Sequence, residues 1–197
     1  MKKNDNLMIE ETIKESVMVI TNLSSIKSEI QKTINAISGG IEKGNKVILF
    51  GNGGSAADAQ HIAAELVGRF EIERNSYPAI SLTSNSSIIT AISNDYSYNV
   101  SFSRQCESLV SKNDIVIGIS TSGNSLNVEK GLLVSKKKGA VTIGLLGKNG
   151  GKIKNIVDIP IIVKSNSTPR IQEAHRVIYH IICNEVEKSL CEEQSKP

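Results

Sequence analysis

The segment that most constrains the fold is residues 47–65, which reads as a strand, a glycine-rich turn and a helix in direct succession. Residues 47–50 are apolar, a length typical of a buried strand, and residues 56–65 are rich in alanine, which has high helix propensity. Glycines let the backbone approach an anion closely, and a helix N-terminus offers free N–H groups and the positive end of its dipole. The segment therefore predicts an anion-binding turn, with the Ser55 hydroxyl as a further donor.

Two other uses of a glycine turn fit the sequence less well. A P-loop ends in a lysine followed by serine or threonine, but no lysine occurs between Lys46 and Lys112. The glycines partly match a dinucleotide fingerprint, which also needs an acidic residue about 20 positions later to hold the ribose. The next apolar run, residues 79–83, is followed by Ser84 and Asn85 instead. A phosphate site thus remains favoured over a nucleotide site.

Apolar runs recur along the chain and alternate with helical segments. The further strand candidates are residues 79–82, 115–119, 141–145 and 159–163. They are continuous and rich in β-branched residues, which is typical of strands buried on both faces of a parallel sheet. Helices are predicted near residues 86–93, 98–110, 125–138, 150–155 and 170–190. This alternation predicts an α/β fold, a three-layer αβα sandwich around a five-stranded parallel sheet.

A helical leader precedes the first strand. Its sequence pattern predicts two helices with a break near residues 22–25. Ile9, Ile13 and Val17 begin an apolar stripe along one face of the first helix. The stripe either covers the sheet or packs against another subunit. We expect a single domain made of this leader, an α/β core and a polar, frayed tail, over residues 1–44, 45–190 and 191–197.

The composition argues against several classes of function. The net charge is only +3, and residues 136–138 form the one lysine run, so no nucleic-acid partner is expected. No apolar run has the length of a membrane span, and the N-terminus lacks an apolar signal core, so no membrane partner is expected. The three cysteines lack C-x-x-C spacing, which suits reduced thiols and predicts a cytoplasmic protein.

A second polar turn follows the third predicted strand, over residues 118–125. It carries Ser120, Thr121, Ser122 and Ser125, whose hydroxyls can donate hydrogen bonds to a phosphate. Taken alone, the turn reads equally as a serine-rich loop with Ser125 as a helix N-cap. Ligands of parallel sheets bind at the carboxyl ends of strands. We therefore expect both turns to face one crevice, and together they favour a phosphate site.

Four polar side chains on two predicted helices can form a metal or proton-transfer site. His61 and Glu65 are four residues apart and share a helix face. Gln172 and His180 are eight apart, about 80° around the last helix, whereas His175 points away from His180. Polar side chains on an otherwise apolar helix need partners. The two pairs together are compatible with zinc or another divalent ion.

These motifs resemble those of the phosphoheptose isomerases, which are sugar isomerase (SIS) domain enzymes. The resemblance spans nearly the whole chain and is carried by residues 50–61, 64–70, 93–95, 118–125 and 170–173, with His180. The serine-rich turn marks only the broad superfamily. The pairing of His61 with Glu65, and of Gln172 with His180, is specific to the isomerases. The resemblance implies the SIS fold.

The resemblance also implies a reaction. The family converts sedoheptulose 7-phosphate, a ketose, into the aldose D-glycero-D-manno-heptose 7-phosphate for bacterial heptose and lipopolysaccharide biosynthesis. It implies a cytoplasmic zinc enzyme that forms a homotetramer, with sites built across subunits. By resemblance, zinc is held by His61, Glu65, Gln172 and His180. The sugar phosphate is held by Asn52, Gly53, Gly54, Ser55, Glu65, Asn94, Asp95, Ser120, Thr121, Ser122, Ser125 and Gln172.

The chemistry of such an isomerase suits these residue types. Ketose–aldose isomerisation passes through an enediol, so it needs a base, an acid and a positive group near the developing oxyanion. We expect Glu65 as the base, His180 as the acid and the metal as a Lewis acid. A zinc-bound carboxylate is a poor base, so Glu65 cannot fill both roles fully in one geometry.

A non-enzymatic relative is the alternative. The same superfamily includes a tetrameric protein that binds the replication initiator DnaA, but the presence of all four predicted metal ligands favours the enzyme. The sequence departs from some isomerases at Thr168 and Pro169, because those enzymes carry an acidic residue just before the position of Arg170. This departure puts a helper role of that acid in doubt and leaves the core reaction unaffected.

Overall fold

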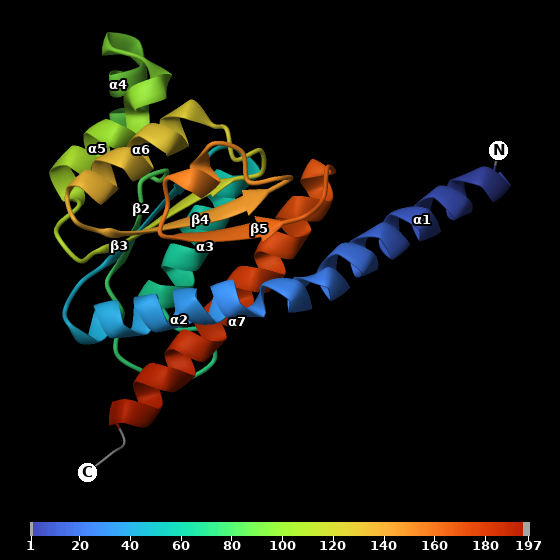
Figure 1. The fold of residues 1–197 in the computed structure, drawn as a ribbon, viewed down its shortest axis with the longest axis horizontal. Coiled ribbons are helices and arrows are strands. Elements are labelled where there is room, and N and C mark those ends of the chain that lie inside the picture. Colours follow the sequence, from blue (N-terminus) through green and yellow to red (C-terminus); the bar gives the residue numbers. More distant parts are fainter. Residues whose placement is uncertain (1, 195–197) are drawn as a thin grey trace.

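Five strands form one parallel sheet in the computed structural model, which describes residues 2–194 (Figure 1). They are β1 (Val47–Gly51), β2 (Ala79–Ser81), β3 (Ile115–Ser120), β4 (Val141–Gly147) and β5 (Ile159–Val163). Each lies on a predicted apolar run. Every residue of β1 and β3 is buried, as expected for strands covered on both faces.

The order of the strands creates a switch point in the sheet. The order is β2-β1-β3-β4-β5, so the chain turns to one side after β1 and then crosses over to the other side at β3. Gly51, at the carboxyl end of β1, is in register with Ile119 of β3. Open parallel sheets bind ligands outside the carboxyl ends of the strands at such a point.

Helices cover both faces of the sheet (Figure 1). One face carries α2 (Lys27–Glu42), α3 (Gly54–Val67) and α7 (Thr168–Gln194). The other face carries α5 (Ser101–Leu109) and α6 (Leu126–Lys137). Between these elements lie α4 (Ser86–Asp95) and two short 3₁₀ helices, η2 (Tyr98–Val100) and η3 (Ile153–Asn155). This arrangement confirms the predicted three-layer αβα sandwich and the alternation of strands and helices.

The leader divides into a helix that leaves the body of the protein and a helix that covers the sheet. The predicted break is confirmed as a 3₁₀ helix, η1 (Asn22–Ile26), between α1 (Lys2–Thr21) and α2. Most of α1 extends away from the body (Figure 1), and Ile9, Ile13 and Val17 are 58%, 56% and 57% exposed. The α1 stripe therefore does not cover the sheet of its own chain.

The C-terminal helix is longer than the sequence predicts. We expected it to end near Leu190 and a frayed tail to begin at residue 191, but α7 continues to Gln194, so that prediction is wrong for residues 191–194. Leu190 is buried, and the Cys191 Sγ lies 3.9 Å from the Tyr77 hydroxyl, so packing supports the last turns. Residues 195–197 of the predicted tail lie outside the described residues.

All three cysteines are free thiols. Burial raises the pKa of Cys106 to about 11 and that of Cys183 to about 12, so neither thiol is ionised near neutral pH. Over residues 2–194, no helix is both long and apolar enough to cross a membrane.

Candidate active site

The two polar turns lie side by side at the switch point. The Asn52 side chain, in the glycine turn, exchanges hydrogen bonds with the Asn127 side chain at the start of α6, each 2.9 Å long. A Cβ on Gly51 would lie 2.8 Å from the Ser55 carbonyl oxygen and 3.0 Å from the Ile119 carbonyl oxygen, so the close packing here requires glycine. The two turns that we expected to face one crevice are thus in contact. Asn127, which joins the turns, was not predicted.

The serine-rich turn gathers its hydroxyl groups. Ser120 Oγ lies 2.9 Å from Ser125 Oγ and 3.4 Å from Ser122 Oγ. Ser125 occupies the N-cap position of α6, but its side chain makes no capping hydrogen bond. Its hydroxyl faces the other serines instead, which favours the phosphate interpretation over the simple cap. Because α3 and α6 both begin at this crevice, two helix N-termini point toward it.

Helices α3 and α7 run in the same direction and stay in register along their lengths. Asp58 contacts Arg176, and His61 contacts Tyr179; each pair is separated by 118 residues in sequence. The Gln172 amide packs over Gly54, where an added Cβ would lie 2.5 Å from Gln172 Nε2. Side chains of α7 therefore lie beside α3 all the way from the glycine turn to His61.

That polar cluster consists of His61, Glu65 and His180. His61 Nε2 lies 2.7 Å from Glu65 Oε1, and the rings of His61 and His180 are 5.4 Å apart. One donor atom from each of the three residues lies within 4.8 Å of the others. The His61 and Glu65 side chains are 40% and 21% exposed, so the cluster is open to solvent. Two imidazoles and a carboxylate are the ligands that a catalytic zinc site uses, with a fourth position left open.

His180 packs against two aromatic rings beside the cluster. Its ring packs edge-on against Tyr179, with centroids 4.7 Å apart, and lies 5.8 Å from the Phe70 ring. Burial, followed by the neighbouring His61, lowers the pKa of His180. The imidazole is therefore neutral near pH 7 and has a lone pair for a metal or an N–H for a substrate oxygen.

Gln172, the fourth predicted metal ligand, lies at the other end of the site. It contacts Gly54, seven residues before His61 on α3, which is roughly 10 Å along a helix. The structure thus brings three of the four predicted ligands together and brings Gln172 to the glycine turn. Its predicted contact with substrate agrees with this location. Its role as a metal ligand stays a prediction.

Asn94 and Asp95 lie at the end of α4, and their side chains are exposed and joined by a 2.9 Å hydrogen bond. Three residues later, the Tyr98 hydroxyl donates a 2.7 Å hydrogen bond to Asn52 Oδ1. This bond ties the segment after α4 to the glycine turn. Tyr98 was not predicted, and a lone exposed tyrosine in the sequence gives no signal for such a role.

A clamp that the sequence analysis missed holds the loop after α3. The Glu187 carboxylate accepts hydrogen bonds from the backbone N–H groups of Phe70, Glu71 and Ile72, at 2.7–2.9 Å, and from Arg74 Nε at 2.8 Å. Burial acts to raise the pKa of Glu187, but these hydrogen bonds outweigh it and hold the pKa below its usual range. The clamp places Phe70 beside His180. An acidic residue on the apolar stripe of α7 was the available signal.

The sequence analysis also missed a group of side chains that contacts His61 at Nδ1. The Tyr179 hydroxyl lies 3.0 Å from His61 Nδ1 and accepts a 3.1 Å hydrogen bond from Arg176 Nε. Burial raises the pKa of Tyr179, so its hydroxyl stays protonated near neutral pH. Burial also raises the pKa of Asp58, although hydrogen bonds from Arg176 and Tyr179 oppose that effect. The signal in the sequence was the three-residue spacing of Asp58 from His61 and of Arg176 from Tyr179.

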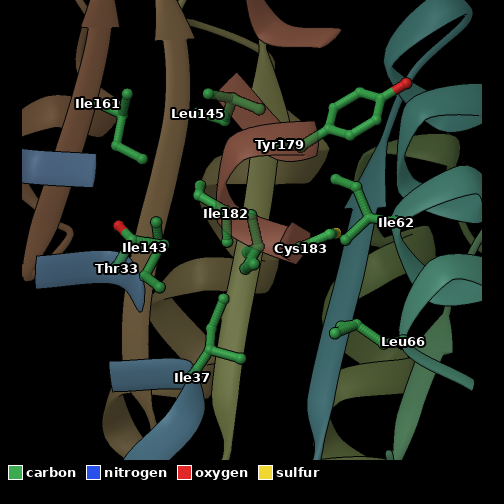
Figure 2. A pocket seen from close by; sticks show the side chains of 11 residues that line it. Thr33, Ile37, Ile62, Leu66, Ile143, Leu145, Ile161, Tyr179, Ile182 and Cys183 are labelled. Carbon is green, nitrogen blue, oxygen red and sulfur yellow. The ribbon is translucent and has the colours of Figure 1, made fainter. Parts of the chain in front are cut away.

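An apolar cavity of about 20 Å³ lies beneath the site, between the sheet and helices α2, α3 and α7. Figure 2 shows its lining of aliphatic side chains, among them Ile37, Ile62 and Leu145. The one hydroxyl at its rim that could bind a polar ligand, Thr33 Oγ1, already donates to the Glu29 carbonyl. A sugar phosphate would find no polar partner there, so this cavity is a packing gap in the core.

The fold and this site define a class of protein. The family model described as "SIS domain" matches residues 13–147, which is more than half of the chain. The chain belongs to the SIS domain family.

Sequence and structural relatives place the chain within one group of SIS domain proteins. The chain is 49% identical over 183 residues to a phosphoheptose isomerase of Citrifermentans bemidjiense, which covers 92% of this chain and 95% of that protein. Solved phosphoheptose isomerases from Neisseria gonorrhoeae and Francisella tularensis are 33% and 31% identical, with TM-scores of 0.88 and 0.90. These matches cover 93% and 95% of this chain, and 98% and 100% of those chains. Within the SIS domain family, the chain belongs with the phosphoheptose isomerases.

Proposed function

We propose that this phosphoheptose isomerase interconverts sedoheptulose 7-phosphate and D-glycero-D-manno-heptose 7-phosphate through an enediol, for bacterial heptose biosynthesis. The observation that supports the proposal is that α3 begins at the glycine turn, which contacts the hydroxyl-rich turn, and carries His61 and Glu65 of the polar cluster further along. The turns suit a phosphate, and the cluster suits proton transfer. Helices α3 and α7 join them, because both run from the crevice to the cluster.

The crevice binds the phosphate end of the substrate. Backbone N–H groups at the start of α3 and α6, together with the clustered serine hydroxyls, supply donors that match phosphate oxygens. The residues assigned to this role are Asn52, Gly53, Gly54, Ser55, Ser120, Thr121, Ser122 and Ser125. Gln172 lies over Gly54 and reaches the same ligand. Asn94 and Asp95 bind the sugar hydroxyls.

Proton transfer is the work of Glu65 and His180. Glu65, a carboxylate, takes the proton from the carbon next to the carbonyl and returns it to the neighbouring carbon. His180 is neutral near pH 7, so it donates its N–H to the substrate oxygen as an electrophile, without first carrying an extra proton. Phe70 and Tyr179 pack against this ring and hold its direction.

The donor atoms of His61, Glu65 and His180 fit a divalent metal ion, which we take to be zinc. Gln172, which lies at the glycine turn of its own chain, is the proposed fourth ligand in a site built across subunits. When bound, zinc supplies positive charge for an oxygen that becomes negative during the reaction. The three free thiols agree with a reducing, cytoplasmic location. The exposed apolar face of α1 supports a homotetramer.

The first test is turnover of sedoheptulose 7-phosphate by the purified protein, with zinc and after chelation. Conversion that stops on chelation supports the isomerase and the metal. Conversion that survives chelation supports the isomerase activity and shows that the reaction does not need the metal. Absence of conversion by folded protein in both states contradicts the proposal and favours the binding-protein alternative, for which DnaA association is the next assay.

The assignment of Glu65 is tested by Glu65→Gln. We expect turnover to fall by about 10²–10⁴-fold or more, because the amide cannot accept the proton. Circular dichroism and thermal unfolding should be unchanged. The matched control is Glu107→Gln, the same substitution at an exposed position on α5, across the sheet. Activity of Glu65→Gln equal to that of the control would remove Glu65 from the reaction.

A further inference from the structure

We propose that Tyr179 is a positioning residue that holds the His61 imidazole with Nδ1 protonated and Nε2 turned to Glu65 and the metal. This inference rests on the proposed metal site. Tyr179 is assigned no contact with the substrate, so its effect on the reaction passes entirely through His61.

The two ring nitrogens of His61 have different partners. Nδ1 faces the Tyr179 hydroxyl at 3.0 Å, and Nε2 faces Glu65 Oε1 at 2.7 Å. The ring also meets the Tyr179 ring edge-on, with centroids 5.4 Å apart. A neutral imidazole carries its proton on one nitrogen and binds a metal through the other. Because Nε2 faces Glu65, it is the nitrogen that would bind a shared metal ion, and Nδ1 would then carry the proton. Without a metal, the contact with the carboxylate oxygen needs the proton on Nε2, and Nδ1 accepts from the Tyr179 hydroxyl.

The hydrogen bonds of Tyr179 accommodate the Nδ1–H tautomer. Arg176 Nε always donates, so the Tyr179 hydroxyl oxygen accepts there, at 3.1 Å. The same guanidinium lies 3.4 Å from the carboxylate of Asp58, a residue that is only 3% exposed. The hydroxyl oxygen has a second lone pair, which accepts from His61 Nδ1–H when Nε2 binds the metal.

The packing of Tyr179 fixes the direction of the hydroxyl. The residue is 1% exposed, and its ring lines the apolar cavity together with Ile62, Ile182 and Cys183. Figure 2 shows the hydroxyl pointing away from the cavity. The ring is therefore held by the core, while its polar end projects into the His61 cluster. A phenylalanine at this position would keep the packing and lose only the polar end.

This role is distinct from structural support. Partners that orient a metal-binding histidine fix its tautomer and ring direction, and their loss typically weakens metal binding or activity by 10–100-fold. The helix register places Tyr179 directly opposite His61, just as it places Arg176 opposite Asp58. These two contacts are consecutive along the same helix pair, so one rigid unit orients His61.

The experiment compares the full-length wild type with Tyr179→Phe. Zinc affinity is measured by competition with a chromophoric chelator, and the His61 tautomer by ¹⁵N chemical shifts of the zinc-bound protein. We expect zinc affinity to fall by about 10–100-fold and the single Nδ1–H tautomer of the zinc-bound wild type to become a mixture. Thermal unfolding should stay near that of the wild type. The control is Tyr77→Phe, which removes a buried hydroxyl that contacts Cys191 and not His61.

The outcomes separate this inference from the proposed function. Wild-type zinc affinity and an unchanged tautomer in Tyr179→Phe would overturn the positioning role while leaving the metal site intact. A wild type that binds no zinc would overturn both the metal site and this inference. Equal weakening in Tyr77→Phe would show a general packing effect and would also overturn the inference.

Discussion

His175 shows how a single residue of α7 can be separated from the site that its neighbours form. It is fully buried, its Nε2 lies 3.0 Å from the Leu146 carbonyl oxygen, and its Nδ1 has no hydrogen-bond partner among the described residues. The sequence already predicted that His175 points away from His180. Burial lowers the pKa of His175 to about 4. The residue is therefore a neutral core group and a source of acid sensitivity.

We predict that His175 makes the protein less stable as the pH falls from about 6.5 to about 4. In this window the unfolded chain binds a proton at residue 175 and the folded chain does not, so falling pH favours unfolding. The full shift corresponds to roughly 3 kcal/mol. Denaturant unfolding of His175→Gln across this window should show a shallower pH dependence than the wild type. An equal slope would contradict the prediction.

At the scale of elements, the Glu187–Arg74 clamp joins α7 to the loop after α3. Both side chains are 2% exposed, and Arg74 also donates a 2.9 Å hydrogen bond to the carbonyl of Glu65. A buried ion pair of this kind is supported by hydrogen bonds on both sides, so removing one partner leaves the other charge uncompensated. The clamp therefore stabilises the loop that carries Phe70 to His180.

Glu187→Gln should lower the free energy of unfolding by about 3 kcal/mol or more, because Arg74 would keep a buried charge without its partner. The matched control is Glu185→Gln, two residues away on the same helix, where the Glu185–Lys188 pair is 47% exposed on each side. That change should cost less than about 1 kcal/mol. Chemical denaturation of both variants measures the difference, and similar losses would contradict a special role for the clamp.

Local patterns in the sequence predicted the elements well and the contacts between distant elements poorly. The five apolar runs became the five strands, and the four-residue spacing of His61 and Glu65 put them together. The clamp could not be predicted, because its partners are 113 residues apart and no local pattern pairs them. Tyr179 reads as one more apolar-stripe residue of α7. Its function depends on the register between two helices, which a single sequence does not reveal.

For the whole molecule, the main unexplained surface is α1. Leu7, Met8 and Met18 are exposed along with Ile9, Ile13 and Val17. Exposed apolar surface on this scale marks an interaction site. The later part of α1 contacts the rest of the protein, where Arg170 Nη1 lies 3.6 Å from Glu15 Oε2. We propose this surface as a contact of the proposed homotetramer, since the other expected use, covering the sheet, belongs to α2.

We predict that Ile13→Lys reduces the oligomeric state without unfolding the protein. A charge in the centre of the apolar stripe must be desolvated in an interface but is harmless in a free subunit. Light scattering coupled to size exclusion should show a smaller species, with unchanged circular dichroism at high dilution. The control is Glu107→Lys, an exposed position on α5, away from α1. A tetramer that persists in Ile13→Lys would place the interface elsewhere.

The spacing of 118 residues between contacting positions of α3 and α7 also determines when the site can be completed. Contacts so distant in sequence form late, because a large loop must close before they stabilise anything. The ribosome makes both polar turns before the 27-residue α7. A product released before α7 would have both turns, but it would lack Gln172, His180 and Tyr179. Proton transfer is thereby tied to the translation of α7.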